Sequence, residues 1–387
     1  MNAPDATVLA WQEDGRQHQA RWRSESGWPA PARVQLADDQ LTADVAYRLA
    51  CEGTALLWRG DFQNARQLVQ ALGRRLDRPG RRPAGAPASA ASPAETFYRH
   101  RQAQGRRARV LGMVVIEVDG DYGIRLRRAP DLRAACVEAW GPPDGQPCVV
   151  ALRECLGLVG AHEWRKAGVE VPALGPPPGN RIHAHYGVFS PVRGEYLDLI
   201  GKAALPADAS LAWDIGTGTG VIAAVLARRG VARIVATDLN PRALACARDN
   251  VRRLGLQAQV EIVEADLFPA GVAPLIVCNP PWLPGKPSSA LEHAVYDPDS
   301  RMLRGFLGGL RERLAPAGQG WLVLSDLAEH LGLRSRDDLL ALFDAGGLVV
   351  RERLDIQPRH PKASDPGDPL AAARSREVTS LWRLAAA

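Results

Sequence analysis

The feature that most constrains the fold of this chain is a glycine-rich turn, Gly216-Thr-Gly-Thr-Gly220. The segment before it, Leu211–Ile215, is apolar and short like a buried strand, and Gly220–Arg229 after it has helical spacing of apolar residues. Glycines at alternate positions let the backbone turn tightly and let a ligand come close to it. The first turn of the following helix offers free N–H groups. The pattern predicts a strand–turn–helix unit that binds a ligand at its turn.

Strands and helices continue to alternate from this unit to the end of the chain. Further strands are expected at 233–237, 260–263, 275–278, 320–324, 348–354 and 378–384, and helices at 241–254, 300–314 and 335–345. This alternation predicts an α/β fold with a doubly wound, seven-stranded, Rossmann-like sheet. The last two strands have no helix between them, which favours an antiparallel last strand.

The chain has 387 residues, a length that suits two domains. A Pro- and Gly-rich break at 175–179 separates the regular pattern from the preceding half. We therefore expect an N-terminal substrate-recognition or accessory domain over 1–170 and a catalytic domain over 171–387. The first is predicted to be a mainly helical α+β domain, with two helices within 41–78, a flexible loop at 79–92, a helix from Pro93 to Gly105, one strand at 110–118, and helices at 130–140 and 149–166.

The composition is that of an ordinary globular protein, with 46% hydrophobic and 24% charged residues. We find no run of 18 uncharged apolar residues, so no transmembrane helix is expected. Acidic residues near the N-terminus argue against a signal peptide, and the six cysteines form no CxxC pair. A cytoplasmic protein without a membrane association is therefore expected, and its oligomeric state cannot be read from the sequence.

Positive charge is concentrated at residues 74–109, which hold ten arginines against Asp77 and Glu95. Such a segment could contact the phosphates of a nucleic acid. The alternative is a solvated, Arg-rich linker in a chain that contains only four lysines. Both interpretations stay open.

Three acids lie at the ends of successive predicted strands. Asp214 precedes the glycine turn, Asp238 ends the next strand, and Asp266 follows the third. In open α/β sheets ligands bind at this edge, where an acid can accept hydrogen bonds from ribose hydroxyls. A carboxylate beside the turn would repel a pyrophosphate and attract a cationic group. The set predicts a nucleoside-like cofactor with a cationic amino-acid part.

The tetrapeptide Asn279-Pro280-Pro281-Trp282 follows the predicted strand 275–278. Two prolines remove two N–H donors and fix two φ angles, so the turn is stiff and its carbonyls are free. The side-chain carbonyl of Asn279 and the backbone carbonyl of Pro280 could accept both hydrogens of an –NH₂ group. Trp282 could stack on a flat amide or base. These residues are predicted to be catalytic by positioning a planar nitrogen.

The runs DIGTGTG, TDLN, EADLF and NPPW together resemble the class I S-adenosylmethionine-dependent methyltransferases. The similarity covers roughly 182–387 and is greatest to the branch that holds release-factor glutamine methyltransferases and ribosomal-RNA base N-methyltransferases. The resemblance implies S-adenosyl-L-methionine as cofactor, with Asp214 near its methionine end, Asp238 on the ribose and Asp266 beside adenine. The implied cofactor-binding residues are Asp214, Gly216, Thr217, Gly218, Gly220, Asp238, Leu239, Asp266, Leu267 and Asn279. The family's tetrapeptide more often ends in Tyr or Phe than in Trp.

Two further segments are candidates for contacts with the acceptor. Residues 185–195 resemble the family segment that precedes the first strand, which makes Phe189, Pro191 and Glu195 candidates. Residues 292–307 occupy the place of the family's variable substrate loop, with Tyr296, Asp297 and Arg301 as candidates. The pair His183 and His185 alternates on one predicted strand with no further ligand, so no metal is expected.

The leading hypothesis is an N-methyltransferase, a transferase that carries out methylation of a planar nitrogen. The first candidate for the methyl acceptor is a glutamine side-chain amide of a protein, with a translation factor as one candidate protein. An exocyclic amine of an rRNA or tRNA base is the alternative, with 74–109 following the phosphates. A small-molecule acceptor and a non-catalytic binding protein are the remaining hypotheses.

Overall fold

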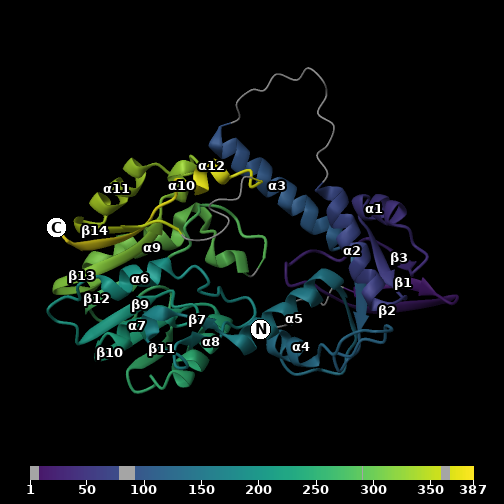
Figure 1. Cartoon of the computed structure of the whole chain (residues 1–387), viewed down its shortest axis with the longest axis horizontal. Helices are drawn as coiled ribbons and strands as arrows, with labels where there is room; N and C mark the ends of the chain where they lie inside the picture. The colour runs from purple at the N-terminus through teal and green to yellow at the C-terminus, as the bar shows by residue number, and fades with distance from the viewer. Residues whose placement is uncertain (1–7, 78–91, 290, 359–366) are drawn as a thin grey trace. The chain divides into compact units, whose positions relative to one another are not determined.

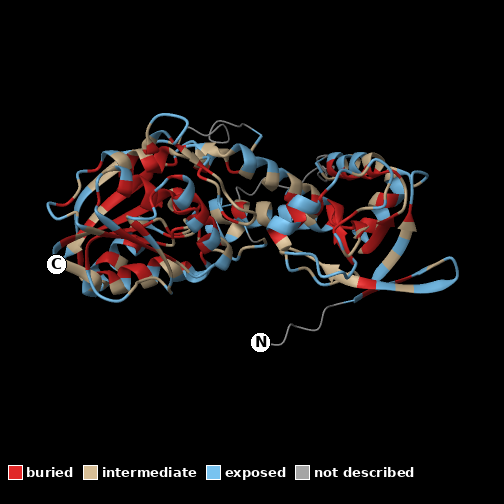
Figure 2. Cartoon of the chain, turned by 90° about the horizontal axis from the view of Figure 1, so that it is seen from below, coloured by how far each residue is buried: buried red, intermediate tan, exposed pale blue. Residues whose placement is uncertain are grey.

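The computed structural model describes residues 8–77, 92–289, 291–358 and 367–387. The chain forms two compact units, the first made of 1–90 and 99–163 and the second of 91–98 and 164–387. Figure 1 labels the helices and strands of both units, and Figure 2 shows the buried residues gathered on their sheets. In the described part of the chain, no helix is both long and apolar enough to cross a membrane.

The N-terminal unit contains a six-stranded mixed sheet in the order β1-β2-β6-β5-β4-β3. Its strands are β1 (Val8–Glu13), β2 (Arg16–Arg23), β3 (Arg33–Ala37), β4 (Thr54–Trp58), β5 (Val114–Val118) and β6 (Cys148–Ala151). Strands β3, β4 and β5 are parallel, whereas β6 runs antiparallel to β5. Its helices, two of which extend into the second unit, are α1 (Ala43–Cys51), α2 (Phe62–Leu76), α3 (Pro93–Leu111), α4 (Arg133–Trp140) and α5 (Leu152–Ala167).

This sheet corrects the expectation that the N-terminal domain contains a single strand, at 110–118. The clearest error is β4, which falls within 41–78, where only helices were expected. All five of its residues are buried, so the strand reads as a continuous apolar run. Such a run cannot be distinguished from a buried helix by periodicity. The predicted strand 110–118 is also shorter, because α3 continues to Leu111 before β5 begins.

The second unit contains a seven-stranded sheet in the order β11-β10-β9-β12-β13-β15-β14. Its strands are β9 (Leu211–Ile215), β10 (Arg233–Asp238), β11 (Val260–Glu264), β12 (Ala273–Cys278), β13 (Leu314–Ser325), β14 (Leu348–Ile356) and β15 (Thr379–Ala386). The first five in this order are parallel, and β15 is antiparallel to both of its neighbours. The predicted seven-stranded sheet with an antiparallel last strand is therefore observed.

Helices cover both faces of this sheet. The helices of this unit are α6 (Glu195–Lys202), α7 (Val221–Arg228), α8 (Pro241–Arg253), α9 (Arg301–Arg313), α10 (Leu327–His330), α11 (Arg336–Ala345) and α12 (Ala371–Arg374). Alternate strand residues enter two separate apolar clusters: Ala212 packs with α6, α7 and α8, whereas Trp213 packs with α9 and α11. This is the two-residue alternation of a strand buried on both faces. A small sheet of β7 (Val169–Glu170) and β8 (Arg181–Ile182) precedes α6.

Candidate functional site

The candidate site lies at the carboxyl end of two neighbouring parallel strands in the centre of the seven-stranded sheet. Cys278, the last residue of β12, is in register with Ile215, the last residue of β9. The glycine turn and Asn279 therefore begin side by side at the same edge. Strand β9 lies between β10 and β12, where the strand order reverses, and this is the position at which open α/β sheets bind ligands.

The glycine turn uses backbone conformations that favour glycine. Gly216, Gly218 and Gly220 have φ angles of 72°, 56° and 80°. A Cβ atom at Gly216 would collide with the terminal methyl group of Met302. At Gly218 a Cβ atom would have no neighbour within 4 Å. The backbone of Gly218 is thus the part of the turn left open to a ligand.

Asp214 lies beneath the turn and is fully buried. One carboxylate oxygen, Oδ2, accepts a hydrogen bond from the Thr217 hydroxyl at 2.6 Å and from the Ala223 N–H at 3.1 Å. The other, Oδ1, is buried without a partner. Burial raises the pKa of Asp214 to about 7, although the two hydrogen bonds act in the opposite direction. The side chain therefore fixes the turn against the start of α7.

Asp238 ends β10 and joins the turn from the neighbouring strand. Its Oδ2 accepts a hydrogen bond from the Gly218 N–H at 3.0 Å, and its Oδ1 accepts one from the Asn240 N–H at 2.9 Å. Each oxygen keeps a second lone pair for another donor. The next residue, Leu239, is 50% exposed despite its apolar side chain. An exposed leucine beside a carboxylate suits a ligand with an apolar face and a hydroxyl edge.

Asp266 and Arg301, which the sequence assigned to different roles, form an ion pair. The Arg301 Nη2 lies 3.1 Å from the Asp266 Oδ2, and both side chains are exposed. Leu267 has a φ of 69°, and its carbonyl accepts a hydrogen bond from the Thr237 hydroxyl at 2.7 Å. That bond ties the loop after β11 to the end of β10.

The tetrapeptide contains a contact that the sequence analysis did not predict. The indole Nε1–H of Trp282 donates a hydrogen bond to the Asn279 Oδ1 at 2.8 Å. The Trp282 side chain is half-buried and packs against the apolar clusters on both faces of the sheet. The Asn279 carbonyl is therefore already oriented by a neighbour and keeps one lone pair for a further donor. Pro280 is buried and Pro281 is half-buried.

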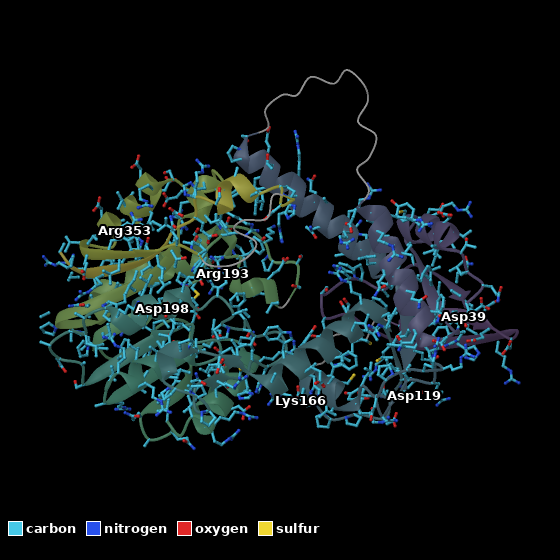
Figure 3. The ribbon with its side chains drawn as sticks, viewed as in Figure 1. Asp39, Asp119, Lys166, Arg193, Asp198 and Arg353 are labelled. Carbon is cyan, nitrogen blue, oxygen red and sulfur yellow. The ribbon has the colours of Figure 1, made fainter. Side chains whose placement is uncertain are left out.

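The segment before α6 contributes an ion-pair network next to Trp282. Phe189 is 38% exposed, whereas Pro191 and Glu195 are buried. Glu195 accepts a hydrogen bond from Arg193 Nε at 3.0 Å, and the Arg193 guanidinium lies 5.3 Å from the centre of the Trp282 ring. Figure 3 labels Arg193 within the second unit. Of the three predicted residues here, only Phe189 is exposed, and Glu195 is occupied by Arg193.

The residues of the predicted substrate loop make contacts that stabilise the loop and the start of α9. Both oxygens of Asp297 accept backbone N–H groups at the start of α9, from Met302 at 3.0 Å and Leu303 at 3.1 Å. The Tyr296 ring lies 6.4 Å from the ring of Phe97, within an apolar cluster of the second unit. Asp297 therefore acts as a helix cap, and Tyr296 is anchored next to α3.

The two histidines have separate partners. His183 Nδ1 lies 2.6 Å from the Arg165 carbonyl, and His185 Nε2 lies 3.2 Å from the Asp249 carboxylate. Among the residues that the structure describes, no group of His, Cys, Asp or Glu side chains could hold a metal ion.

Three residues near the tetrapeptide were missed by the sequence analysis: Arg193, Ser325 and Glu377. Arg193 Nη2 donates to Glu377 Oε1 at 3.0 Å, and the Ser325 hydroxyl donates to the same oxygen at 2.8 Å. Arg193 and Glu377 are 184 residues apart, so no local pattern connects them. The one sequence signal for this network was the charged pair Arg193 and Glu195, which follows a stretch without charged residues.

Comparison with known proteins agrees with this description of the second unit. Residues 179–343 match the family model described as the methyltransferase small domain. A release factor glutamine methyltransferase of Deinococcus radiodurans is 42% identical over 152 residues, which are 38% of this chain and 54% of that protein. One of Cereibacter sphaeroides is 38% identical over 122 residues, covering 31% and 40% of the two chains.

A ribosomal protein L11 methyltransferase of Sorangium cellulosum is 29% identical over 169 residues, covering 44% of this chain and 45% of that protein. The chain thus spans about half the length of the curated relatives that it matches. The segment matched by the family model contains the glycine turn, Asp238, Asp266 and Asn279–Trp282. For this part of the chain, the resemblance predicted from those motifs is confirmed.

Proposed function

We propose that this chain, whose residues 179–343 carry a methyltransferase domain of the S-adenosylmethionine-dependent class, methylates a planar nitrogen. The first acceptor that we propose is the side-chain amide of a protein glutamine. The observation that carries the proposal is the register of Cys278 with Ile215, which brings the glycine turn and Asn279 to one edge of the sheet. A donor bound at the turn and an acceptor bound at Asn279 would meet there.

The residues at the turn fit S-adenosylmethionine. The open backbone at Gly218 accommodates close approach, the free lone pairs of Asp238 suit ribose hydroxyls, and exposed Leu239 offers an apolar surface to a base. Asp214 is fully buried beneath the turn, so it would support the cofactor by fixing the turn through Thr217 and Ala223 and not by contacting the ligand itself. When bound, the cofactor supplies an activated methyl group on a sulfonium.

The tetrapeptide suits the acceptor side of the reaction. The remaining lone pair of Asn279 Oδ1 and the carbonyl of Pro280 would each accept one N–H of the substrate's –NH₂ group, which aims the nitrogen lone pair at the methyl group. As the N–C bond forms and the C–S bond breaks, the electron pair of that bond stays on sulfur and one N–H proton is released to solvent. The prolines hold both acceptors rigidly. Acceleration would come from positioning and from exclusion of water by the half-buried Trp282.

The names of the relatives support a protein acceptor connected with translation. Some are release factor glutamine methyltransferases, and others are ribosomal protein L11 methyltransferases. As part of this proposal, the N-terminal unit recognises the protein that carries the glutamine. We further propose that the enzyme acts in the cytoplasm, where translation factors are found.

The RNA alternative depends on the arginines of 74–109. Two of them are engaged within the first unit: Arg75 pairs with Asp44 at 2.6 Å and Arg107 with Asp77 at 3.2 Å. Residues 78–91 lie outside the described part of the chain. These ion pairs involve two of the ten arginines, so the choice between the protein and the RNA acceptor is left to the experiment.

The test is incubation of the full chain with methyl-labelled S-adenosylmethionine and cell extract, followed by protease, ribonuclease or ultrafiltration. We expect the label in macromolecules that protease digests and ribonuclease does not. Label lost to ribonuclease, with a steep loss of activity as salt rises, would instead identify an RNA acceptor. Label that passes the ultrafilter would identify a small molecule. Label no greater than in a control without the enzyme would contradict the methyltransferase proposal.

A further inference from the structure

A charged network surrounds Arg193, beside the tetrapeptide but outside it. The Arg193 guanidinium donates from Nε to Glu195 and from Nη2 to Glu377, both at 3.0 Å. The two glutamates are only 7% and 3% exposed. Burial of two carboxylates is unfavourable unless their charge is compensated, and this one guanidinium supplies a positive charge to both.

The network is anchored on the sheet by Ser325, the last residue of β13. Its hydroxyl donates to Glu377 at 2.8 Å and accepts a hydrogen bond from the Leu327 N–H at 3.0 Å. Arg193 is therefore held by one partner at the start of α6 and one in the segment before β15, and the second partner is anchored by the end of β13. A planar guanidinium held at two of its nitrogens has a fixed orientation.

The fixed guanidinium contacts the aromatic residue of the tetrapeptide. Its central carbon lies 5.3 Å from the centre of the Trp282 ring, within the range of a cation–π contact. Trp282 also packs against the apolar clusters on both faces of the sheet. With these contacts, the ring is held in a single orientation, and its Nε1–H points at the Asn279 Oδ1, 2.8 Å away.

We propose that Arg193 is a positioning residue that fixes the Asn279 carboxamide through Trp282. The proposal rests on the proposed function, which assigns Asn279 to the acceptor nitrogen. Because Trp282 donates to one lone pair of Asn279 Oδ1, the other lone pair has one direction in which to accept the acceptor's N–H. A Phe or Tyr ring at this position has no N–H group, so the indole is what links the charged network to the amide.

The decisive variants are Arg193→Lys, which keeps the charge but loses the planar fork, and Trp282→Phe, which keeps a ring but loses the donor. The matched control is Arg353→Lys. Arg353 on β14 lies 4.8 Å from the ring of Trp382 on β15. The control substitution therefore alters the same kind of cation–π contact at a place away from the tetrapeptide. Figure 3 labels both Arg193 and Arg353.

The first readout is independent of activity. In ¹⁵N–¹H spectra of the full chain, the Trp282 indole signal is identified as the one missing from Trp282→Phe. In Arg193→Lys we expect this signal to shift and its proton to exchange with solvent faster, by about tenfold or more for a weakened buried hydrogen bond. In Arg353→Lys it should stay unchanged. An unchanged Trp282 signal in Arg193→Lys would overturn the proposal.

The second readout is methyl transfer to the labelled fraction identified above. We expect Arg193→Lys and Trp282→Phe each to lower kcat by about tenfold to a hundredfold, as expected for a misplaced reacting group, with unchanged affinity for S-adenosylmethionine. A kcat equal to that of the wild type in either variant would overturn the proposal. So would a lower kcat in Arg193→Lys without a change at the Trp282 indole, since Arg193 would then act directly on the acceptor. If the wild type transfers no methyl group, the proposed function fails, and the indole measurement alone decides whether Arg193 fixes Trp282.

Discussion

The two sheets of this molecule use the carboxyl ends of their parallel strands in opposite ways. In the N-terminal unit, acids follow β3, β4 and β5, and each is closed off by a neighbour. Asp39 accepts the Asp61 N–H at 3.0 Å, Asp61 pairs with Arg127 and Arg128, and Asp119 pairs with a further arginine at 2.8 Å. In the second unit, the same edge carries a glycine turn whose middle is open.

The comparison teaches that acids at strand ends do not by themselves make a ligand site. What differs is the backbone beside them. A Cβ atom on Gly60 would collide with the Asp39 side chain and would lie 2.9 Å from its backbone nitrogen, whereas one on Gly218 would touch nothing. The acids of the first edge are engaged in ion pairs and hydrogen bonds, whereas the second edge leaves open space beside the backbone of Gly218.

The largest expected effect uses pH to separate the two edges, because their acids are shifted in opposite directions. Burial raises the pKa of Asp214 to about 7, from an ordinary 3.8. The stability that this group contributes is present below pH 4 and is lost as pH rises to 7. From pH 4 to pH 8 the wild type should lose about 4 kcal/mol of unfolding free energy that Asp214→Asn does not lose, so the variant becomes more stable relative to the wild type by that amount.

Asp61 gives the opposite dependence and serves as the control. The Arg128 guanidinium holds the pKa of the Asp61 carboxyl well below its usual range. Its contribution is thus present at neutral pH and is lost as pH falls. Hydrogen exchange of the amides of 211–228, measured against denaturant, follows the second unit separately. A difference between Asp214→Asn and the wild type that stays constant from pH 4 to pH 8 would show that Asp214 does not titrate in this way.

The second prediction concerns Asn279, at the open edge. Asn279→Ala should lower the rate of methyl transfer by about a hundredfold, equivalent to about 3 kcal/mol of lost transition-state stabilisation, with cofactor affinity largely kept. The physical reason is the loss of the side-chain acceptor next to the stiff prolines. The measurement pairs initial rates of transfer with calorimetric titration of S-adenosylmethionine.

Asp61→Ala is the matching change in the N-terminal unit, at the carboxyl ends of β3, β4 and β5. It should lower the melting temperature of the N-terminal unit, since Asp61 also caps α2 by accepting the Gln63 N–H at 2.8 Å. Cofactor affinity should not change. Transfer by Asn279→Ala at the rate of the wild type would exclude the role assigned to the tetrapeptide.

The same contrast explains what the sequence could predict. The second unit was predictable because its signals are local. Helix α8, for example, begins at Pro241 as predicted, and the side chain of Asn240 before it accepts the Arg242 N–H at 2.9 Å. The glycine turn, likewise, requires positive φ angles that few other residues adopt.

The rest depended on contacts between distant residues. All residues of β4 are buried, so the strand shows no alternation of apolar and polar residues. Its assignment as a strand depends on its hydrogen bonds to β3 and β5, which lie elsewhere in the sequence. One of the two partners of Arg193, Glu377, lies 184 residues away in the sequence, and no sequence pattern indicates that it is buried next to Arg193. The bond from Trp282 to Asn279 spans only three residues, but its direction depends on the packing of the indole between two cores.

The smallest effect compares one glycine from each edge. Gly218→Ala should destabilise the second unit by only about 1–2 kcal/mol, the cost of a positive φ for a residue with a side chain, because nothing obstructs its methyl group. It should nevertheless weaken cofactor binding clearly, since the methyl group would occupy the space that the ligand needs. Gly60→Ala should do the reverse and destabilise the N-terminal unit by about 1–3 kcal/mol through crowding against Asp39, with no effect on binding. Denaturant unfolding and calorimetric titration of S-adenosylmethionine measure both quantities on each variant. If Gly218→Ala bound the cofactor as tightly as the wild type, the open backbone would not be the surface that holds it, and the contrast between the two edges would have to be explained by the acids alone.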